Sequence, residues 1–358
     1  AMNPRGRTLA THLHHSVDAA GFYPGNLPAD GSFGSTRSDA AVVFTYAYWW
    51  MSGDNAFLER YWPVVNAYGI ARIAADPNAE GWAFGTLPSD TLPEGDPTPP
   101  GFVHLTSEAL NLRLTLGLGK QSSRNGFEIR AFNHRVETLG TQFRKNHFNE
   151  DGSLKYRSIT AHLLALRCGL LEDGAQKVKV GHGLLELLDQ QTVLSPFEQS
   201  PFAAANILPV LSWLGHHDKA ISLVKAQDPK ALSPVALAAI SEWLVSMQAG
   251  IDSELPGFQS IRVQPRLPDP NLLSFTKAHF DTPYGQITTH TWQEDGATHF
   301  ELGIPANTTA LIQLPLIEDL KLTEDGKDVD GNFPGFNRIG DVANFRCLSG
   351  SYHFVLGK

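Results

Sequence analysis

The sequence predicts two parts, a helical domain over residues 1–250 followed by an antiparallel β-sandwich over residues 251–358. Up to Gly250, apolar residues recur at three- and four-residue steps, the spacing that lines one face of a helix. Beyond Pro256 they alternate with polar residues, the spacing of a half-buried strand. Because the periodicity changes within residues 241–270, we expect the domain boundary there.

The helical part contains about ten predicted helices, joined alternately by short turns and longer loops. This pattern is typical of helical hairpins arranged in a ring or a solenoid. No sequence repeat is evident, which favours a toroid over a repeat array. The predicted helices are residues 5–20, DAAVVFTYAYWWMSG, DNAFLERYWPVVNAYGIARIAA, SEALNLRLTLGLG, FEIRAFNHRVETLGTQFRKNHF, SITAHLLALRCGLL, GAQKVKVGHGLLELLDQQ, PFAAANILPVLSWLG, DKAISLVKAQ and the helix ending at Gly250.

Two of these segments have further consequences. The helix DAAVVFTYAYWWMSG is apolar on nearly all sides and is therefore predicted to be buried. The irregular segment 76–102 contains Trp82 and Phe84, and an earlier loop contains Tyr23. Loops of this length are usually functional or disordered, and aromatic residues favour order. We expect these aromatic loops to line a site.

The β part contains strand-like runs separated by short turns, the pattern of a sandwich. The runs are SIRVQP, LLSFTKAHF, GQITTHTW, THFELGI, TALIQLP and SYHFVLG. They show no cluster of exposed aromatic residues. This favours a structural role, a buttress packed on the helices, over sugar binding.

Composition excludes several classes of partner. The formal net charge of −9 and a pI of about 5.8, without any basic run, argue against nucleic acid or an anionic membrane. No segment approaches the roughly 20 apolar residues of a membrane span, and the first residues lack a secretory signal. A cytoplasmic protein is expected. Ala1 before Met2 suggests a cloning remnant and an otherwise complete chain.

Cysteine usage and motifs predict no cofactor and no metal. Cys168 and Cys347 stand in different kinds of predicted element, and we expect both thiols to be buried and inert. Nothing resembles a phosphate-binding loop, a dinucleotide fingerprint, a nucleophile elbow or a zinc motif.

Several runs are similar to the α-L-rhamnosidases, family 78 of the glycoside hydrolases. After the boundary these are EWLVSMQAGIDSELPGFQSIRVQPRLPD, DTPYGQITTHTW, IPANTTALIQLP and LSGSYHF; before it they are SDAAVVFTYAYWWMSGDNAFLERYWPVVNAYG and SITAHLLALRCGLL. The resemblance covers most of the chain. It implies a six-hairpin (α/α) barrel, here with fewer helices than the full ring, followed by a β-sandwich.

The departures from that family bear on chemistry. The Asp/Glu/Arg-rich motif that carries the family's general acid has no counterpart, and ISLVKAQDPKALSPV stands where a segment resembling GATTxWE carries the base. Pro234 replaces a family histidine. Inverting hydrolysis needs two carboxyl groups roughly 6.5–9.5 Å apart. The resemblance thus implies a divergent member in which standard rhamnosidase chemistry is not expected and other carboxylates must act.

Candidate residues come from the predicted loops and helix starts. Asp39 matches the aspartate of the family's barrel segment and stands beside Arg37; a substrate contact and a helix-dipole role are both open. Asp90, Glu94 and Asp96 lie in the aromatic loop, where burial against Trp82 could split their pKa values.

Glu198 opens an apolar helix as either a first-turn carboxylate or a pocket group. The predicted catalytic residues are Asp39, Glu94, Asp96 and Glu198, and the predicted substrate-binding residues are Tyr23, Arg37, Trp82, Phe84, His104, Glu108, Tyr156, Arg157 and His162. Each of the latter also has a structural interpretation. His104 and Glu108, four apart, lack the third ligand of a metal site.

Three functions remain open. The first is a glycoside-hydrolase-like enzyme that acts on a sugar or glycosylated small molecule in the barrel mouth. The second is a repurposed isomerase, cyclase or lyase that uses the cavity to position a small molecule. The third is a non-catalytic binding module. In each case the expected partner is a small molecule or glycoside.

Overall fold

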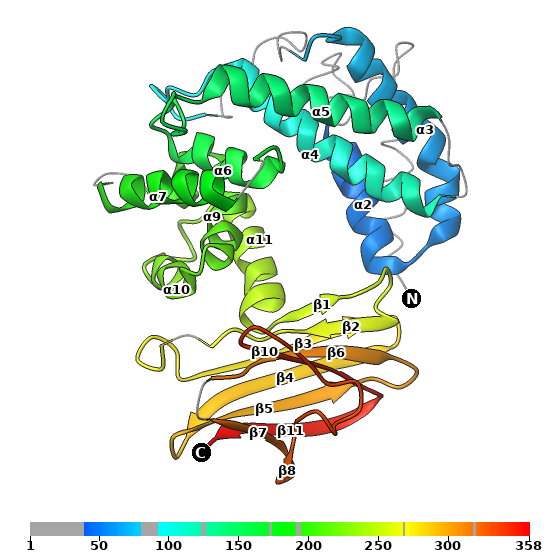
Figure 1. The fold of residues 1–358 in the computed structure, drawn as a ribbon, viewed down its shortest axis with the longest axis vertical. Coiled ribbons are helices and arrows are strands. Elements are labelled where there is room, and N and C mark those ends of the chain that lie inside the picture. The colour runs from blue at the N-terminus through cyan, green and yellow to red at the C-terminus, as the bar shows by residue number, and fades with distance from the viewer. Residues whose placement is uncertain are drawn as a thin grey trace. The chain divides into compact units, whose positions relative to one another are not determined.

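The computed structural model describes residues 39–79, 92–122, 127–171, 174–190, 195–267, 269–317 and 320–358. These residues divide into two compact units, which we call the helical unit and the β unit. The helical unit comprises 39–49 and the described residues of 54–210, and the β unit comprises 50–53 and the described residues of 211–358. The first strand begins at Ile251 (Figure 1). The proposed division into domains at residue 250 stays a prediction.

Helices precede sheets along the chain, which confirms the predicted fold class. The helices are α2 (Ala40–Ser52), α3 (Asn55–Ala75), α4 (Pro100–Gln121), α5 (Phe127–His147), α6 (Ile159–Cys168), α7 (Gly174–Gln190), α8 (Pro196–Gln199), α9 (Pro201–Trp213), α10 (His217–Lys225) and α11 (Pro234–Trp243). In the helical unit α4 packs on α5 and on α6, and α6 packs on α7, as expected of helical hairpins. The predicted helix over residues 5–20 lies outside the described residues.

Two helix predictions are corrected. α4 begins at Pro100, seven positions before the predicted start, because proline is well tolerated in the first helical turn. α2 is not buried all round, since Val43 is 44% and Met51 43% exposed. Three serine and aspartate caps, Asp54, Ser158 and Ser233, accept a backbone N–H at the start of α3, α6 and α11.

The β unit contains two sheets (Figure 1). The strands are β1 (Ile251–Ser253), β2 (Ser260–Val263), β3 (Phe275–Thr282), β4 (Gly285–Glu294), β5 (Ala297–Ile304), β6 (Thr309–Pro315), β7 (Lys321–Glu324), β8 (Lys327–Asp328), β9 (Asn337–Ile339), β10 (Val342–Cys347) and β11 (Gly350–Gly357). One sheet has the order β1-β2-β6-β10-β9 and the other β3-β4-β5-β11-β7-β8. The second sheet is antiparallel throughout, whereas β2 and β6 of the first run parallel.

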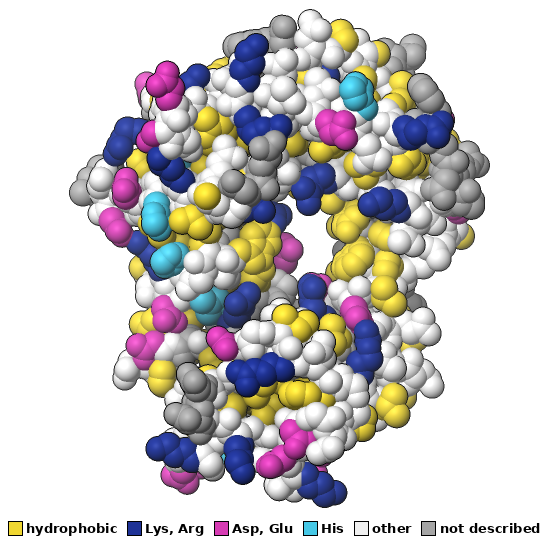
Figure 2. Space-filling model, viewed as in Figure 1, with side chains coloured by type: hydrophobic (Ala, Val, Ile, Leu, Met, Phe, Trp, Pro, Cys, Tyr) yellow, Lys and Arg dark blue, Asp and Glu magenta, His cyan; other side chains and the backbone are white. Residues whose placement is uncertain are grey.

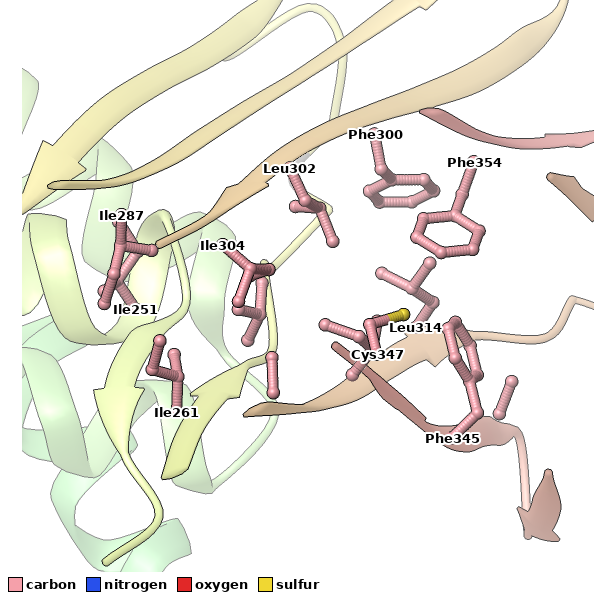
Figure 3. Close-up of a cluster of buried hydrophobic side chains, with 14 of the residues drawn as sticks. Ile251, Ile261, Ile287, Phe300, Leu302, Ile304, Leu314, Phe345, Cys347 and Phe354 are labelled. Atoms are coloured by element: carbon pink, nitrogen blue, oxygen red, sulfur yellow. The ribbon is translucent and has the colours of Figure 1, made fainter. Parts of the chain in front are cut away.

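Side chains from both sheets form one apolar core (Figure 3). Ile261, Ile312 and Phe345 come from the first sheet, and Phe300 and Phe354 from the second. All five are fully buried. Strand alternation directs every second side chain inward, so the predicted period-two runs produce a sandwich.

The junction between α11 and β1 contains a π-helical turn, Leu244–Gln248, in which Ala249 N–H donates to Leu244 O at 2.9 Å. Gly250 follows with φ +73°, and a Cβ there would lie 2.1 Å from the carbonyl carbon of Gln264. Only glycine fits this close approach.

The outer face of the second sheet corrects a prediction about aromatic residues. Trp292 stacks on His290 at 4.5 Å and on His299 at 4.8 Å between ring centroids, and neighbouring Phe275 is 56% exposed. The strands thus do carry a cluster of partly exposed rings, which the sequence reading missed because it weighed each strand alone; β3–β4–β5 pairing brings the rings together.

Surface charge and cysteines follow the predictions. Acidic and basic side chains are interspersed over the face in view in Figure 2. Cys168 and Cys347 are buried and form no disulfide. Burial raises the pKa of each thiol to about 12, which keeps both protonated near neutral pH. Among the described helices, none combines the length and apolar character needed to cross a bilayer.

Candidate functional site

Side-chain hydrogen bonds in the helical unit join the starts of α6 and α9, the segment ahead of α4, and the residue before α2. Ser158 Oγ, at the start of α6, donates to Asp96 Oδ2 ahead of α4 at 2.8 Å. Thr160 Oγ1 in α6 lies 3.0 Å from Ser200 Oγ at the start of α9. Asn111 Nδ2, midway along α4, donates to the carbonyl of Asp39 before α2. We call the region of these contacts the candidate site.

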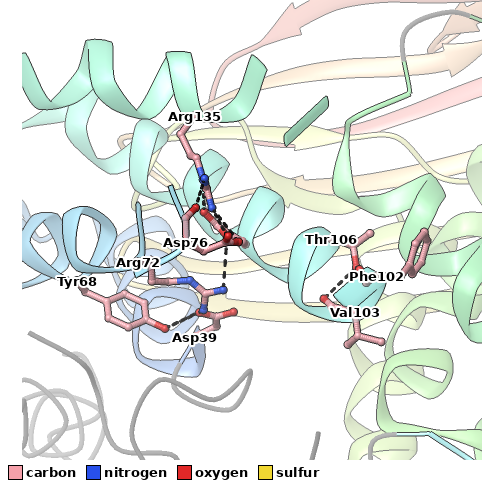
Figure 4. A network of polar contacts seen from close by, with 9 residues as sticks. Asp39, Tyr68, Arg72, Asp76, Phe102, Val103, Thr106 and Arg135 are labelled. Atoms are coloured by element: carbon pink, nitrogen blue, oxygen red, sulfur yellow. Dashed lines mark hydrogen bonds and ion pairs between the residues drawn. The ribbon is translucent and has the colours of Figure 1, made fainter. Parts of the chain in front are cut away.

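A chain of alternating charges is buried beside it (Figure 4). Tyr68 Oη and Arg72 Nη1 both donate to Asp39 Oδ1 at 2.6 Å, and Arg72 Nη2 lies 4.0 Å from Glu108 Oε2. Arg135 binds both Glu108 oxygens, at 2.6 and 3.1 Å, in the two-pronged geometry that suits a guanidinium.

The chain ends at Asp76, where Arg135 donates to the carbonyl at 2.5 Å and to Oδ2 at 3.4 Å. We call Asp39, Tyr68, Arg72, Asp76, Glu108 and Arg135 the charged cluster. Their side chains are nine-tenths or more buried. Four elements contribute to it: the residue before α2, the C-terminal half of α3, the first half of α4, and α5.

The sequence analysis identified Asp39 and Glu108 but missed the two arginines that hold them. Asp39 pairs with Arg72. The neighbouring Arg37 lies outside the described residues. A signal for Arg72 was present. It stands four residues after Tyr68 on a largely apolar helix face, where an arginine needs a buried partner.

Burial dominates the electrostatics of Asp39. Desolvation raises its pKa to about 6, against the attraction of Arg72 and the hydrogen bond from Tyr68. Burial alone would lower the pKa of Arg72, but the charges of Asp39, Tyr68 and Glu108 raise it instead. Asp39 Oδ2 is buried and accepts no hydrogen bond within the described chain. The cluster therefore contains a carboxyl group with one bare oxygen that changes protonation near neutral pH.

Asp96 and His162 take part in a second group. Asp96 Oδ1 accepts the backbone N–H of Thr98 at 2.8 Å, so both of its oxygens are engaged. His162 Nδ1 lies 2.7 Å from the carbonyl of Ser158, and burial lowers its pKa. A Cβ at Gly183 would lie 2.6 Å from His162 Nε2, so glycine makes room for the ring.

Tyr156 belongs to an aromatic group around the start of α4. Its hydroxyl lies 2.7 Å from His147 Nδ1, and both rings contact Phe102 edge-on at 5.4 and 5.0 Å between centroids. Burial, followed by the charge of Lys155, lowers the pKa of His147 to about 4. His147 is therefore neutral at physiological pH.

The other predicted residues have local roles or lie elsewhere. Glu198 completes a capping box with Ser195 at the start of α8 and is exposed, a first-turn role. Arg157 is exposed and donates to Gln190 at 2.8 Å. Glu94 is exposed ahead of α4, and His104 is buried one turn before Glu108. Tyr23, Arg37, Trp82, Phe84 and Asp90 lie outside the described residues.

No group of three or more histidine, cysteine, aspartate or glutamate side chains within the described ranges is placed to hold a metal ion. The absence of cofactors stays a prediction.

Comparison with known proteins identifies the architecture. The profile described as bacterial alpha-L-rhamnosidase 6 hairpin glycosidase domain matches residues 6–235, and that of the bacterial alpha-L-rhamnosidase C-terminal domain matches residues 250–328. An alpha-L-rhamnosidase of Streptomyces avermitilis is 23% identical over 391 aligned positions, which cover 96% of this chain and 35% of the relative. The chain thus spans about a third of that relative's length.

Solved structures agree on the fold. The Streptomyces avermitilis alpha-L-rhamnosidase complexed with L-rhamnose superposes with a TM-score of 0.78 at 20% identity, covering 97% of this chain and 36% of that one. The Dictyoglumus thermophilum alpha-L-rhamnosidase gives 0.84 at 16% identity, covering 98% and 43%. The comparisons support the glycosidase relationship and favour neither the repurposed enzyme nor the binding module.

Proposed function

Because this chain belongs to the bacterial alpha-L-rhamnosidase six-hairpin glycosidase family, we propose that it binds the sugar of a glycoside at the candidate site and hydrolyses the glycosidic bond. The proposed substrate class is an α-L-rhamnoside or a closely related deoxyhexoside, since a relative of the same fold binds L-rhamnose. The acid and base groups differ from those that the family motifs supply.

The Asp39 carboxyl group is the observation that carries the proposal. A general acid works best when its pKa lies near the operating pH, and the pKa of Asp39 is about 6. Its Oδ2 is the oxygen that the cluster leaves unused, whereas Tyr68 and Arg72 fix Oδ1. Once the proton leaves, the resulting carboxylate faces the Arg72 guanidinium, which stabilises its charge.

The reaction then needs a second carboxylate. In the proposed step Asp39 gives its proton to the glycosidic oxygen while that oxygen leaves the anomeric carbon. A base takes a proton from water as the water oxygen bonds to the same carbon. We assign the base to Glu94, because Asp96 has both oxygens engaged and Glu198 caps α8. Glu94 is exposed and free to orient a water molecule.

The test is turnover of 4-nitrophenyl glycosides, with the α-L-rhamnoside first, combined with calorimetric titration of L-rhamnose. We expect Asp39→Asn and Glu94→Gln each to lower kcat/KM by about 100-fold or more, the contribution typical of a positioned acid or base. Asp39→Asn should also remove the limb of the pH–rate profile that titrates near pH 6, since a side-chain amide does not ionise in this pH range. A merely structural role would not remove that limb.

Asp151→Asn is the matched control, because Asp151 is an exposed carboxylate of the same unit paired with Lys179. It should leave kcat/KM unchanged, as should Glu198→Gln. Absence of both turnover and rhamnose binding in the wild-type protein would refute the proposal. Binding without turnover would refute the acid/base assignment alone.

A further inference from the structure

The contact between Arg72 and Asp39 uses only one arm of the guanidinium. Arg72 Nη1 donates to Asp39 Oδ1 at 2.6 Å and to Tyr68 Oη at 3.2 Å (Figure 4). Asp39 Oδ2 is buried and accepts no hydrogen bond from any residue that the structure describes. An arginine and a carboxylate frequently pair in two-pronged fashion, with one nitrogen on each oxygen. The one-armed contact therefore has a cause outside the pair.

The second arm of Arg72 lies beside Glu108. Arg72 Nη2 is 4.0 Å from Glu108 Oε2, and the two side chains are 2% and 1% exposed. At this distance the two charges attract each other without a hydrogen bond, and burial keeps water and salt from screening the attraction. Because Nη1 is bound to Oδ1, Nη2 is the nitrogen that would reach Asp39 Oδ2. Glu108 and Asp39 Oδ2 therefore compete for the same arm.

A second guanidinium fixes Glu108 in place. Arg135, from α5, donates to Glu108 Oε1 at 2.6 Å and to Oε2 at 3.1 Å. Arg135 is itself held by the carbonyl of Asp76, to which it donates at 2.5 Å. A carboxylate that is bound through both oxygens has its plane and its position set by the partner. The attraction that Glu108 exerts on Arg72 therefore has a fixed direction.

The charge of Glu108 also acts on Asp39 directly. Burial is the main reason why the pKa of Asp39 is raised to about 6, and the negative charge of Glu108 adds to that rise. The charge of Arg72 and the hydrogen bond from Tyr68 act in the opposite direction. A second hydrogen bond from Arg72, on Oδ2, would favour the carboxylate and lower the pKa. Both effects of Glu108 thus keep the Asp39 carboxyl group protonated up to a higher pH.

We propose that Glu108 is a positioning residue for Asp39, which keeps the second arm of Arg72 away from Oδ2 so that this oxygen carries the proton for the substrate. The use of that proton in hydrolysis rests on the proposed function, whereas the arrangement of the three side chains does not. Glu108 acts through Arg72 and not on the substrate. When its charge is removed, Arg72 turns to bind both oxygens of Asp39, and the oxygen that donates the proton is lost to a two-pronged ion pair.

The test is a titration of Asp39 in the full chain, followed by carbon-13 NMR of its carboxyl carbon, with Asp39→Asn identifying the signal. Glu108→Gln removes the charge and nearly keeps the shape of the side chain. In this variant the midpoint of the Asp39 titration should fall by at least about one pH unit, a tenfold change in proton affinity. At about pH 7 kcat/KM for the rhamnoside should then fall by about tenfold, through kcat rather than KM, because tenfold less of the acid is protonated.

Glu137→Gln is the matched control, since Glu137 is an exposed carboxylate of α5, and it should leave the Asp39 midpoint unchanged. Glu108→Asp keeps the charge and should shift the midpoint less than Glu108→Gln does. A crystal structure of the wild-type protein at about pH 8, where Asp39 is ionised, requires no variant to fold. In it Arg72 Nη2 should stay beyond hydrogen-bond distance of Asp39 Oδ2.

Two results would overturn the inference: two-pronged binding of Asp39 by Arg72 in the wild-type crystal, or an unchanged Asp39 midpoint in Glu108→Gln. Neither result depends on turnover, so either would leave the proposed function standing. A lowered midpoint in a chain that does not hydrolyse the rhamnoside would support the position of Glu108 and count against the proposed function.

Discussion

Both units bury a polar network. One network consists mainly of charged groups, and the other consists of neutral groups. The charged cluster of the helical unit joins three carboxyl groups and two guanidinium groups. The network of the β unit, which we call the neutral relay, consists of Ser212, His217, Trp243, Gln248 and Thr276. Ser212, Trp243 and Gln248 are each at most 2% exposed.

Each member of the neutral relay has a partner of the right kind. Trp243 Nε1 donates to Ser212 Oγ at 2.9 Å, and the hydroxyl faces His217 Nδ1 at 2.9 Å. His217 Nε2 lies 2.8 Å from Gln248 Oε1, so the proton belongs on Nε2 and Nδ1 is the acceptor. Gln248 then donates to Thr276.

The two networks differ in their spare hydrogen-bonding capacity. Donors and acceptors match one to one in the relay, which makes it a structural tie between α9, α10, the π-turn and β3. The charged cluster leaves Asp39 Oδ2 bare and raises the pKa of that carboxyl group to about 6. Buried groups with perturbed pKa values and spare bonding capacity concentrate at functional sites.

The largest expected loss of stability comes from leaving a buried charge without its ion-pair partner. Arg135→Met removes the only two-pronged partner that Glu108 has among the described residues, and Glu108 is 1% exposed. We expect the free energy of unfolding, from urea denaturation, to fall by about 3–5 kcal/mol. Arg157→Met, at an exposed arginine of the same unit, should stay within about 0.5 kcal/mol.

A double variant separates a lost attraction from a stranded charge. Arg135→Met combined with Glu108→Met replaces the pair by apolar side chains, and such replacements are often close to neutral. The double variant should therefore be more stable than Arg135→Met alone. If it is less stable, the ion pair itself stabilises the fold and the comparison with the relay fails.

The two networks should respond to acid in opposite directions. The pKa of Asp39 is higher in the folded state, about 6 against an ordinary 3.8, so folding takes up protons between these values. Its contribution to the free energy of unfolding rises as pH falls through this window, by up to about 3 kcal/mol. Burial lowers the pKa of His217, so its contribution is full above about pH 6.5 and is lost as pH falls below it.

Difference curves against variants measure these contributions. Urea denaturation between about pH 4 and 7 gives the free energy of unfolding of each protein. The difference between wild type and Asp39→Asn should increase as pH falls, whereas the difference between wild type and His217→Gln should decrease. The charges of Arg266 and Asp218, which also act on His217, are common to wild type and His217→Gln. Parallel difference curves would mean that the two networks do not differ in protonation.

The sequence predicted more of the fold than of the candidate site. Period-two alternation identified β2 to β6 and β11, because each strand has one face in the core. β1, β7, β8, β9 and β10 were missed. β1, β8 and β9 have three residues or fewer and are too short to show a period. β7 has only four residues, and three consecutive residues of β10 are buried, which breaks the alternation. The start of α4 was placed late because Pro100 and Gly101 read as loop residues, although proline suits a first helical turn.

At the site, sequence reading found the carboxylates but not their partners. Asp39 and Arg72 are 33 residues apart, and Glu108 and Arg135 are 27 apart. Their pairing depends on how α3, α4 and α5 pack, which no local pattern reveals. The role of Glu198, by contrast, was open to prediction: Ser195 and Glu198 have the spacing of a capping box.

The smallest expected effect tests the neutral relay. Trp243→Phe deletes the indole N–H but keeps an aromatic ring near His217, whose ring lies 5.0 Å away. Ser212 Oγ keeps its bond to His217, so no buried group is left without a partner. The free energy of unfolding should fall by about 1 kcal/mol, the net value of one neutral hydrogen bond.

Ser212→Ala and Trp213→Phe bracket this value. Ser212→Ala leaves both the Trp243 N–H and His217 Nδ1 without a partner and should lower the free energy of unfolding by more, about 2–3 kcal/mol. Trp213 is 51% exposed, so Trp213→Phe should lower it by less than about 0.5 kcal/mol. A loss for Trp243→Phe as large as that for Arg135→Met would erase the distinction between the two networks. Removing one member of the neutral relay should therefore cost no more than the one or two hydrogen bonds that it makes, whereas removing one ion-pair partner from the charged cluster leaves a buried charge without a partner.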